Sequence, residues 1–307
     1  MKKILSDLEN MGILARAVKP EHLSELKQEM GNLLAADAVL NQTIGRYMGK
    51  FEYDLDKKSF QAKSILVVAV PDKISRIYFN HEGKKKVVYL PPQYLFNTSV
   101  ELEKTQPLIM EVNRNIKDAL GAGGYKVEKI NLPCKLMAVR SGLAKYGRNN
   151  IAYINGESSF YWIGVYLTDM PIEVDTWQGV ETMELCKTCS LCAENCPTCA
   201  IPSDRYLLHA EKCLTFHNEN TDEFPNWIKK SDHNAIIGCL KCQIVCPMNK
   251  SRIEDMREGE EFTEEETLLI LATNVLADLP EYLQKKLEHD NLAGDYEFIP
   301  RNLKVLL

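Results

Sequence analysis

The 307-residue chain lacks any run of roughly 18 consecutive apolar residues, so we expect no membrane-spanning helix and no membrane partner. Its first residues, MKKILSDLENMGILARAV, have no continuous apolar core and no small-residue cleavage site, which argues against a secretory signal peptide. A twin-arginine export signal is also missing. We therefore interpret the start as an amphipathic helix and expect a cytoplasmic protein.

A basic excess, the usual mark of a nucleic-acid surface, is missing as well. Residues 1–180 carry 24 Lys+Arg against 20 Asp+Glu, residues 181–307 carry 13 against 23, and the whole chain has a net charge of −6. The basic stretch HEGKKKVVY (81–89) contains Lys84, Lys85 and Lys86, which we interpret as an exposed turn. The acidic stretch EGEEFTEEE (258–266) is typical of a solvated helix start.

What the chain has in abundance is cysteine, with ten residues of this type. Disulfides are not expected, because the chain is long and predicted to be cytosolic. Zinc suits paired CxxC spacing but usually takes four ligands in two pairs. The first cluster instead reads CKTCSLCAENCP, in which Cys186, Cys189, Cys192 and Cys196 precede a proline with the spacing of bacterial ferredoxins. In that pattern the fourth cysteine binds a second cluster.

The ferredoxin pattern therefore predicts a reciprocal set of cysteines downstream, and CLKCQIVCP supplies it, with Cys213 as the displaced first member. We predict two [4Fe–4S] clusters. The expected ligands of cluster one are Cys186, Cys189, Cys192 and Cys246. Those of cluster two are Cys196, Cys213, Cys239 and Cys242. Cys199 and Cys134 are left over and are interpreted as small buried side chains, and His209, His217 and His233 as structural or surface groups.

Hydrophobic periodicity organises the rest of the chain. Helices are predicted at 20–34 and at 105–121, and a buried central strand over 63–71. Further strands are predicted at 85–91 and 125–131, and two more within 151–167 joined through an Asn155-Gly156 turn. These elements predict an α+β domain over residues 1–178, a ferredoxin-like double-cluster domain over 179–252 and a C-terminal helical tail over 253–307 that packs on the core.

The order of these landmarks resembles that of the cobalamin-dependent epoxyqueuosine reductases and, more distantly, the reductive dehalogenases. The resemblance rests on FQAKSILVVAVP, on RSGLAKYGRNNIAYINGESSFYWIGVYLTDMPIE, on the cysteine motifs and on the final IPRNLKVLL. It covers most of residues 60–307 and is strongest over 140–250.

The resemblance implies a nitroreductase-like sheet domain that binds cobalamin and receives electrons through the two clusters. By analogy, the corrin would be lined by the loop residues Gly142, Leu143, Tyr146, Gly147 and Arg148. The alternative is a tight loop that packs on the cysteine module, with its glycines there for backbone reasons.

The chain departs from this family where the family carries a catalytic aspartate, because no acidic residue stands between Glu128 and Glu157. Asn131 falls near the expected place but cannot donate a proton as a carboxylic acid does. Tyr89 and Tyr94, around two adjacent prolines, are the other candidate proton donors, since dehalogenases use a tyrosine. These departures and the acidic net charge argue against tRNA as a partner.

The sequence thus predicts a reductase with two [4Fe–4S] clusters and a corrinoid, supplied by an external low-potential donor such as ferredoxin or flavodoxin. Its expected substrate is a small molecule or a modified nucleoside. The alternative, favoured by the missing aspartate, is a non-catalytic iron–sulfur protein that transfers electrons or handles corrinoids. A zinc-stabilised interaction protein is a third alternative.

Overall fold

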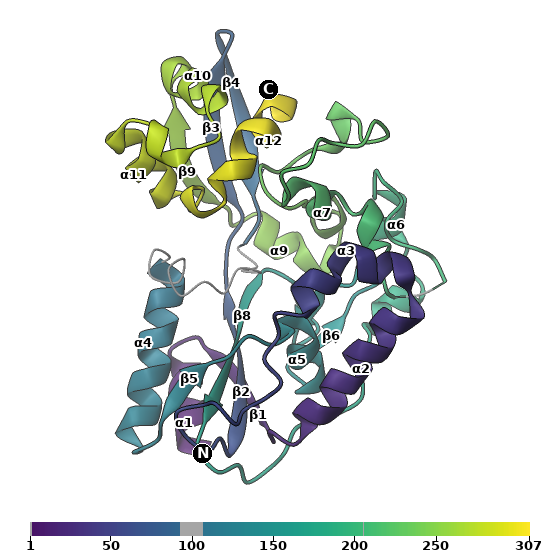
Figure 1. Cartoon of the computed structure of the whole chain (residues 1–307), viewed down its shortest axis with the longest axis vertical. Helices are drawn as coiled ribbons and strands as arrows, with labels where there is room; N and C mark the ends of the chain where they lie inside the picture. The colour runs from purple at the N-terminus through teal and green to yellow at the C-terminus, as the bar shows by residue number, and fades with distance from the viewer. Residues whose placement is uncertain (1, 93–106, 205) are drawn as a thin grey trace.

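The computed structural model describes residues 2–92, 107–204 and 206–307. Two lobes stand one above the other, and the cysteine module runs along the side of both (Figure 1). No helix in these described stretches is long and apolar enough to span a membrane.

The lower lobe is built on a four-stranded sheet that is antiparallel throughout, in the order β1-β2-β8-β5. Its strands are β1 (Leu14–Val18), β2 (Ser64–Pro71), β5 (Val127–Lys129) and β8 (Tyr161–Thr168). Every residue of β2 except Pro71 is buried. This confirms the buried central strand that the apolar run over 63–71 predicts.

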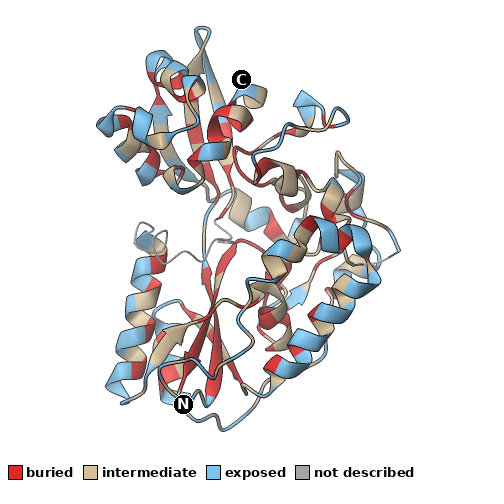
Figure 2. Cartoon of the chain, viewed as in Figure 1, coloured by how far each residue is buried: buried red, intermediate tan, exposed pale blue. Residues whose placement is uncertain are grey.

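Helices cover both faces of this sheet, which makes a three-layer core (Figures 1 and 2). One face carries α1 (Lys2–Asn10) and α4 (Pro107–Ala122), and the other carries α2 (His22–Ala36) and α5 (Cys134–Arg140). Both long helices predicted from periodicity are present. The N-terminal stretch is helical only at its start, because residues 14–18 form the edge strand β1. From α2 the chain continues into α3 (Ala38–Met48), which reaches the cysteine module.

The upper lobe combines segments that are far apart in the chain. The hairpin of β3 (Ser75–His81) and β4 (Lys84–Leu90) rises from the lower sheet, and β3 pairs in parallel with β9 (Arg257–Phe262) (Figure 1). The rings of Phe79 and Phe262 stack with their centres 4.8 Å apart. The helical elements of this lobe are α10 (Glu264–Ala272), η6 (Leu276–Asp278), α11 (Glu281–His289), η7 (Ala293–Phe298) and α12 (Ile299–Leu306).

Three sequence expectations differ from this arrangement. Residues 75–90 leave the first sheet and share a core with the C-terminal segment. The first part of the acidic stretch, Arg257–Phe262, is a strand because it pairs with β3 and buries Phe262, and the predicted helix start follows only at Glu264. Lys84, Lys85 and Lys86 belong to β4, and the turn itself is formed by Glu82 and Gly83, both with positive φ.

The strands predicted around Asn155-Gly156 exist, but they do not form one hairpin. β7 (Ala152–Ile154) pairs with β6 (Ala144–Tyr146), whereas β8 joins the main sheet. Asn155 and Gly156 do form a turn, with φ of +50° and +73°. As a result, the segment over 144–154 stands apart from the sheet and faces the cysteine module.

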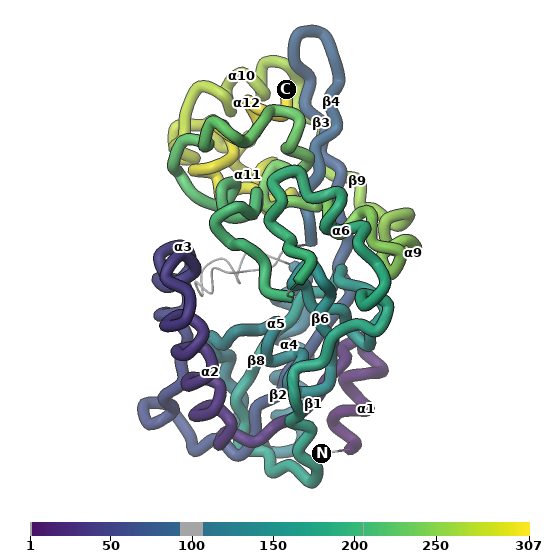
Figure 3. Tube along the Cα trace, turned by 90° about the vertical axis from the view of Figure 1, so that its right-hand side faces the viewer, coloured from purple at the N-terminus to yellow at the C-terminus, as the bar shows by residue number. Residues whose placement is uncertain are grey.

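The cysteine module consists of short helical turns joined by loops, which follow one another along one side of the molecule (Figure 3). They are η2 (Glu184–Lys187), α6 (Leu191–Glu194), η3 (Ala210–Lys212), α7 (Leu214–Asn218), η4 (Lys230–Asp232), α8 (Lys241–Ile244), η5 (Pro247–Asn249) and α9 (Lys250–Ile253). The module lies along the side of both lobes, and its η3 contacts α3 of the lower lobe.

Candidate iron–sulfur centres and their surroundings

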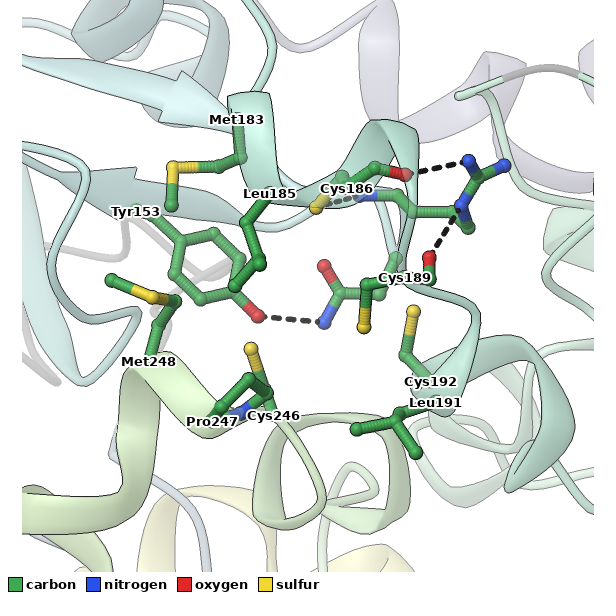
Figure 4. A pocket seen from close by; sticks show the side chains of 12 residues that line it. Tyr153, Met183, Leu185, Cys186, Cys189, Leu191, Cys192, Cys246, Pro247 and Met248 are labelled. Carbon is green, nitrogen blue, oxygen red and sulfur yellow. Dashed lines mark hydrogen bonds between the residues drawn. The ribbon is translucent and has the colours of Figure 1, made fainter.

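Four cysteines from opposite ends of the module line one pocket. Cys186, Cys189 and Cys192 come from η2, the following loop and α6, and Cys246 comes from the turn after α8. Their sulfur atoms point into a common space that is closed by apolar side chains (Figure 4). The structure therefore brings together the four residues predicted for cluster one, including the distant Cys246.

The other four predicted ligands form a second group. The thiol of Cys242 interacts electrostatically with Cys239, Cys213 and Cys196, and Cys239 interacts with Cys213 and Cys196. Cys242 also interacts with Cys192 of the first group, so the two groups are neighbours. This is the arrangement in which electrons can pass from one cluster to the next.

The raised pKa values of these thiols indicate that the thiolates need a bound metal. Burial, together with the neighbouring cysteines, raises the pKa of Cys192 to about 11 and that of Cys239 to about 12. Burial and the same repulsion raise the pKa of Cys242 well above its usual value. Four thiolates in one buried group are unfavourable unless bound iron balances their charge, because a coordinating thiol is deprotonated by its metal. The donor set fits [4Fe–4S] clusters.

Backbone N–H groups are directed at several of the sulfur atoms. The N–H of Arg148 donates to Cys186 Sγ over 3.4 Å, and that of Ala200 donates to Cys196 Sγ over 3.3 Å. Hydrogen bonds to cluster sulfurs are one of the means by which a protein sets the reduction potential. One such donor comes from the lower lobe and not from the module itself.

The side chain of Arg148 makes the main polar contact between the lower lobe and the first cysteine group. Its guanidinium donates to the carbonyl oxygens of Cys186 (2.7 Å), Cys189 (3.2 Å) and Ser203 (2.8 Å). It also lies over the ring of Tyr206, 5.4 Å from the ring centre. The loop that carries the first cysteines is thereby tied to the segment over 144–154.

A buried polar network makes a second connection. Asn249 Oδ1 accepts from the hydroxyl of Ser158 and from the backbone N–H of Ser159, each over 3.0 Å. Its Nδ2 donates to Ser159 Oγ and to the carbonyl oxygen of Gln243, each over 2.9 Å. All four of these polar residues are buried. The start of β8 is therefore fixed against the second cysteine motif.

The five residues predicted to line a corrin lie in this same contact region. Gly142 has a φ of +75°, and a Cβ on it would stand 3.3 Å from Gln178 Oε1. Leu143 is fully buried in the lower core. Burial raises the pKa of Tyr146. A Cβ on Gly147 would stand 2.5 Å from Tyr153. The guanidinium of Arg148 faces the cysteine module.

These five residues therefore pack within the protein, and their contact with a corrin stays a prediction. The observed packing is the alternative that the sequence left open for the glycine loop.

The candidate proton donors lie in three settings. Tyr89 is partly buried on β4, where its carbonyl oxygen accepts from the N–H of Ile236. The Nδ2 of Asn131 donates to the carbonyl oxygen of Lys50 over 3.0 Å, so its amide fixes a neighbouring loop. Tyr94 lies outside the described residues.

Of the two remaining cysteines, Cys134 is partly buried at the start of α5 and packs against the lower core. The expectation that Cys199 is buried is wrong, because it is exposed and has a φ of +51°. The chain turns sharply there so that the N–H of Ala200 can reach Cys196, and this turn leaves the Cys199 side chain outside.

Sequence reasoning missed two ionisable residues beside the second cysteine group. Lys135 on α5 interacts electrostatically with Cys213, Cys242 and Glu219, and burial lowers its pKa. Burial raises the pKa of Glu219 to about 8, an effect that Asp295 reinforces and Lys135 opposes. No local pattern marks either residue, since they come from different parts of the chain.

Comparison with known proteins agrees with this site. Residues 185–249 match a family described as a 4Fe–4S double cluster binding domain. Over 145 residues the chain is 29% identical to the epoxyqueuosine reductase of Xanthomonas campestris, which covers 46% of this chain and 39% of that protein. With the epoxyqueuosine reductase of Bacillus subtilis it shares 22% identity over 70% of this chain and 56% of that protein. The matched region thus spans well under two thirds of these relatives.

Solved structures show the fold of the whole chain. The epoxyqueuosine reductase of Streptococcus thermophilus matches with a TM-score of 0.67 and 17% identity, over 100% of this chain and 80% of that chain. The B. subtilis enzyme gives a TM-score of 0.66 and 19% identity over the same shares. The chain therefore has the mixed helix and strand fold of epoxyqueuosine reductases and carries a double [4Fe–4S] module.

Proposed function

We propose that this protein is an iron–sulfur reductase whose two clusters deliver electrons to a substrate held against the lower lobe. The observation that carries the proposal is the direct attachment of both cysteine groups to that lobe. Arg148 contacts the loop of the first group, and α3 contacts η3, the turn that precedes Cys213 of the second. A free-standing electron carrier has no need of such contacts.

The clusters would be held by the two sets of cysteines described above, and bound clusters supply single electrons at low potential. The residues around them give the first pocket an apolar lining. Met183, Leu185, Leu191 and Met248 line it, and the buried Tyr153 forms its wall beside Cys246 (Figure 4). The external electron donor is proposed to be a ferredoxin or a flavodoxin.

A corrinoid is the proposed second cofactor, on the strength of the likeness to epoxyqueuosine reductases. When bound and reduced, it supplies a strong nucleophile for attack on an electrophilic substrate. Backbone groups of the loop over 142–148 are the proposed contacts, because the side chains of Leu143 and Arg148 are engaged elsewhere.

The proposed substrate is an electrophilic small molecule or modified nucleoside of the epoxyqueuosine kind. One related enzyme has been crystallised with an epoxyqueuosine-modified tRNA stem loop. The acidic net charge of −6 favours a substrate smaller than a whole tRNA. The free nucleoside and the stem loop should therefore be compared side by side.

The test uses protein purified without oxygen and reconstituted with iron, sulfide and cobalamin. We expect iron for two [4Fe–4S] clusters, one cobalt per chain, broad visible absorbance and reduction of epoxyqueuosine nucleoside. Intact clusters without bound cobalt would overturn the corrinoid assignment. Reduction of another protein without turnover of either small substrate would support the electron-transfer alternative instead.

A further inference from the structure

Asn302 lies on α12 and is fully buried, although its side chain is polar. Its Nδ2 donates to two backbone carbonyl oxygens, that of Asn218 and that of Ile236, each over 2.8 Å. These carbonyls stand near opposite ends of the insertion that separates Cys213 from Cys239. One side-chain amide of the last helix therefore joins the two segments that carry predicted ligands of cluster two.

Both carbonyl groups are close to a ligand along the chain. Asn218 ends α7, which begins directly after Cys213, and Ile236 is separated from Cys239 by two residues. The fully buried Asn218 also donates through its Nδ2 to the carbonyl oxygen of Gly238 over 2.7 Å. Because so little backbone intervenes, a displacement of this network also moves the two cysteines.

Arg301 fixes the orientation of the Asn302 amide. Its Nη2 and Nε donate to Asn302 Oδ1 over 2.9 and 3.2 Å, which leaves the Nδ2 of Asn302 directed at the two carbonyls. The same guanidinium donates to the carbonyl oxygen of His217 over 2.7 Å and to that of Asp222. Two consecutive residues of α12 thus bind the backbone of the insertion.

The upper lobe holds the end of the insertion from a second side. The N–H of Ile236 donates to the carbonyl oxygen of Tyr89 on β4 over 2.9 Å. The side chains of Ile236 and Ile237 are buried in the core that the hairpin shares with the C-terminal helices. The segment before Cys239 therefore follows the upper lobe.

Asn249 stands in a corresponding relation to the first cysteine group. It is also fully buried, and its Nδ2 donates to the carbonyl oxygen of Gln243, which precedes Cys246 by three residues. Its other contacts are with Ser158 and Ser159 of the lower lobe. Each cysteine group is thus joined to a different lobe by a buried asparagine.

We propose that Asn302 is a positioning residue that holds the ligands of cluster two and thereby sets the reduction potential of this cluster. The inference rests on the proposed function, since it concerns the second of the two clusters that deliver electrons. Backbone N–H groups of Thr215 and Phe216, in the first turn of α7, are directed at Cys213. Hydrogen bonds to the sulfurs and solvent exposure set the potential of a cluster, and both depend on where α7 lies.

An anaerobic redox titration followed by electron paramagnetic resonance tests this role in the cluster-loaded protein. In Asn302→Ala the buried carbonyl groups of Asn218 and Ile236 lose this donor, so the two ends of the insertion are less firmly joined. We expect the potential of cluster two to shift and its iron to pass to a chelator on the order of tenfold faster. Cluster one should keep its potential and its iron.

Two matched variants separate positioning from general destabilisation. Asn249→Ala should show the opposite pattern, with cluster one changed and cluster two intact. Leu303→Ala removes the fully buried neighbour of Asn302 from the core of the upper lobe. It should lower the urea midpoint while both potentials stay as in the wild type.

If Asn302→Ala does not fold, Arg301→Lys decides, because a lysine keeps the charge but lacks the fork that holds several oxygens at once. It should shift the potential of cluster two and leave that of cluster one. An unchanged potential and unchanged iron loss of cluster two would overturn the inference, and so would an equal shift in Leu303→Ala. If the wild type holds both clusters but reduces no substrate, the proposed function fails, and the potentials alone decide for Asn302.

Discussion

The Nη2 atom of Arg148 donates a hydrogen bond to the carbonyl oxygen of Cys186 over 2.7 Å. The same residue directs its backbone N–H at the sulfur of Cys186. One residue of the lower lobe thus holds both the backbone and the sulfur of a predicted cluster ligand. The sheet domain and the first cysteine group form one structural unit through this contact.

Replacing Arg148 with Gln should loosen this unit. Three hydrogen bonds from a charged group to carbonyl oxygens are removed, and hydrogen bonds of this kind contribute about 1.5–3 kcal/mol. We expect a lower urea midpoint, faster loss of iron and a changed potential of the first cluster in an anaerobic redox titration. Arg148→Lys should recover only part of the effect, because an ammonium group cannot reach three carbonyls at once.

The control for Arg148 is Lys145→Gln. Lys145 lies on the same segment and pairs with Glu181 over 2.8 Å at the surface, where such a pair contributes at most about 1 kcal/mol. Equal iron loss in both variants would show that Arg148 has no special role at the cluster.

The crossing of ligands between the two cysteine motifs can be tested by removing one of them. Cys246→Ala should abolish cluster one, although Cys246 follows the motif that mainly serves cluster two. Cys196→Ala should abolish cluster two. We expect each variant to retain about half of the iron, with the signal of a different cluster left in the electron paramagnetic resonance spectrum.

The matched control is the exposed Cys199→Ala, which should keep both clusters. If Cys246→Ala and Cys196→Ala lost the same cluster, the ligand assignment would be wrong.

Local patterns predicted much of this protein. The buried strand β2 and the helices α2 and α4 follow from the hydrophobic pattern, because buried positions recur at regular intervals along the sequence. The two cysteine sets follow from their spacing in the sequence, because each potential ligand is recognised from its residue type alone. The pairing of β3 with β9 could not be predicted in this way, since no local feature records which distant strand will be the partner.

The ligands of the candidate site could be predicted from the sequence, but the contacts around them could not. The cysteines gather as predicted, but the contacts of Arg148 are with backbone carbonyls, which every residue has and which leave no trace in a sequence. The electrostatic interaction of Lys135 with Glu219 joins residues that are far apart in the sequence, so no local pattern could predict it.

A pH-dependent contact joins α2 to the loop over residues 175–178. The His22 ring stacks on Trp177, and its Nε2 lies 2.7 Å from Asp175 Oδ2. Burial alone would raise the pKa of Asp175, but hydrogen bonds from His22 and from the backbone N–H of Trp177 outweigh it and hold the pKa below its usual value. The ionised carboxylate therefore stabilises the folded state.

The sign of the effect follows from linkage. A lowered folded-state pKa contributes stability that is present above the unfolded value of about 3.9 and is lost as the pH falls through the folded value. Asp175→Asn should therefore reduce the free energy of unfolding by about 1 kcal/mol at pH 7, and the difference should shrink as the pH falls below the unfolded value. Urea unfolding at several pH values measures this, with the exposed Glu173→Gln as control. A difference that persists unchanged at pH 3 would exclude the carboxylate as its cause.

A substitution at Gly147 tests whether the glycine loop is needed for packing or only for cofactor binding. A Cβ at this position would stand 2.5 Å from Tyr153 Cε2 and 2.7 Å from Asn149 Oδ1, and both residues are buried around the first cysteine group. Gly147→Ala should therefore destabilise the protein by about 1–3 kcal/mol through overpacking. Because Tyr153 lines the cysteine pocket, the visible absorbance of the first cluster should weaken as well.

The nearby Gly156→Ala is the matched comparison for Gly147→Ala. Gly156 has a φ of +73°, but a Cβ there would meet only Met183 Sδ at 3.6 Å, so it tests backbone strain without a clash. We expect a cost of about 1–2 kcal/mol and unchanged cluster absorbance. If Gly147→Ala left stability and absorbance intact while cobalamin binding was lost, the glycine would serve the cofactor and not the packing. Loss of stability in protein without cobalamin would establish that the loop first of all holds the lower lobe against the cysteine module.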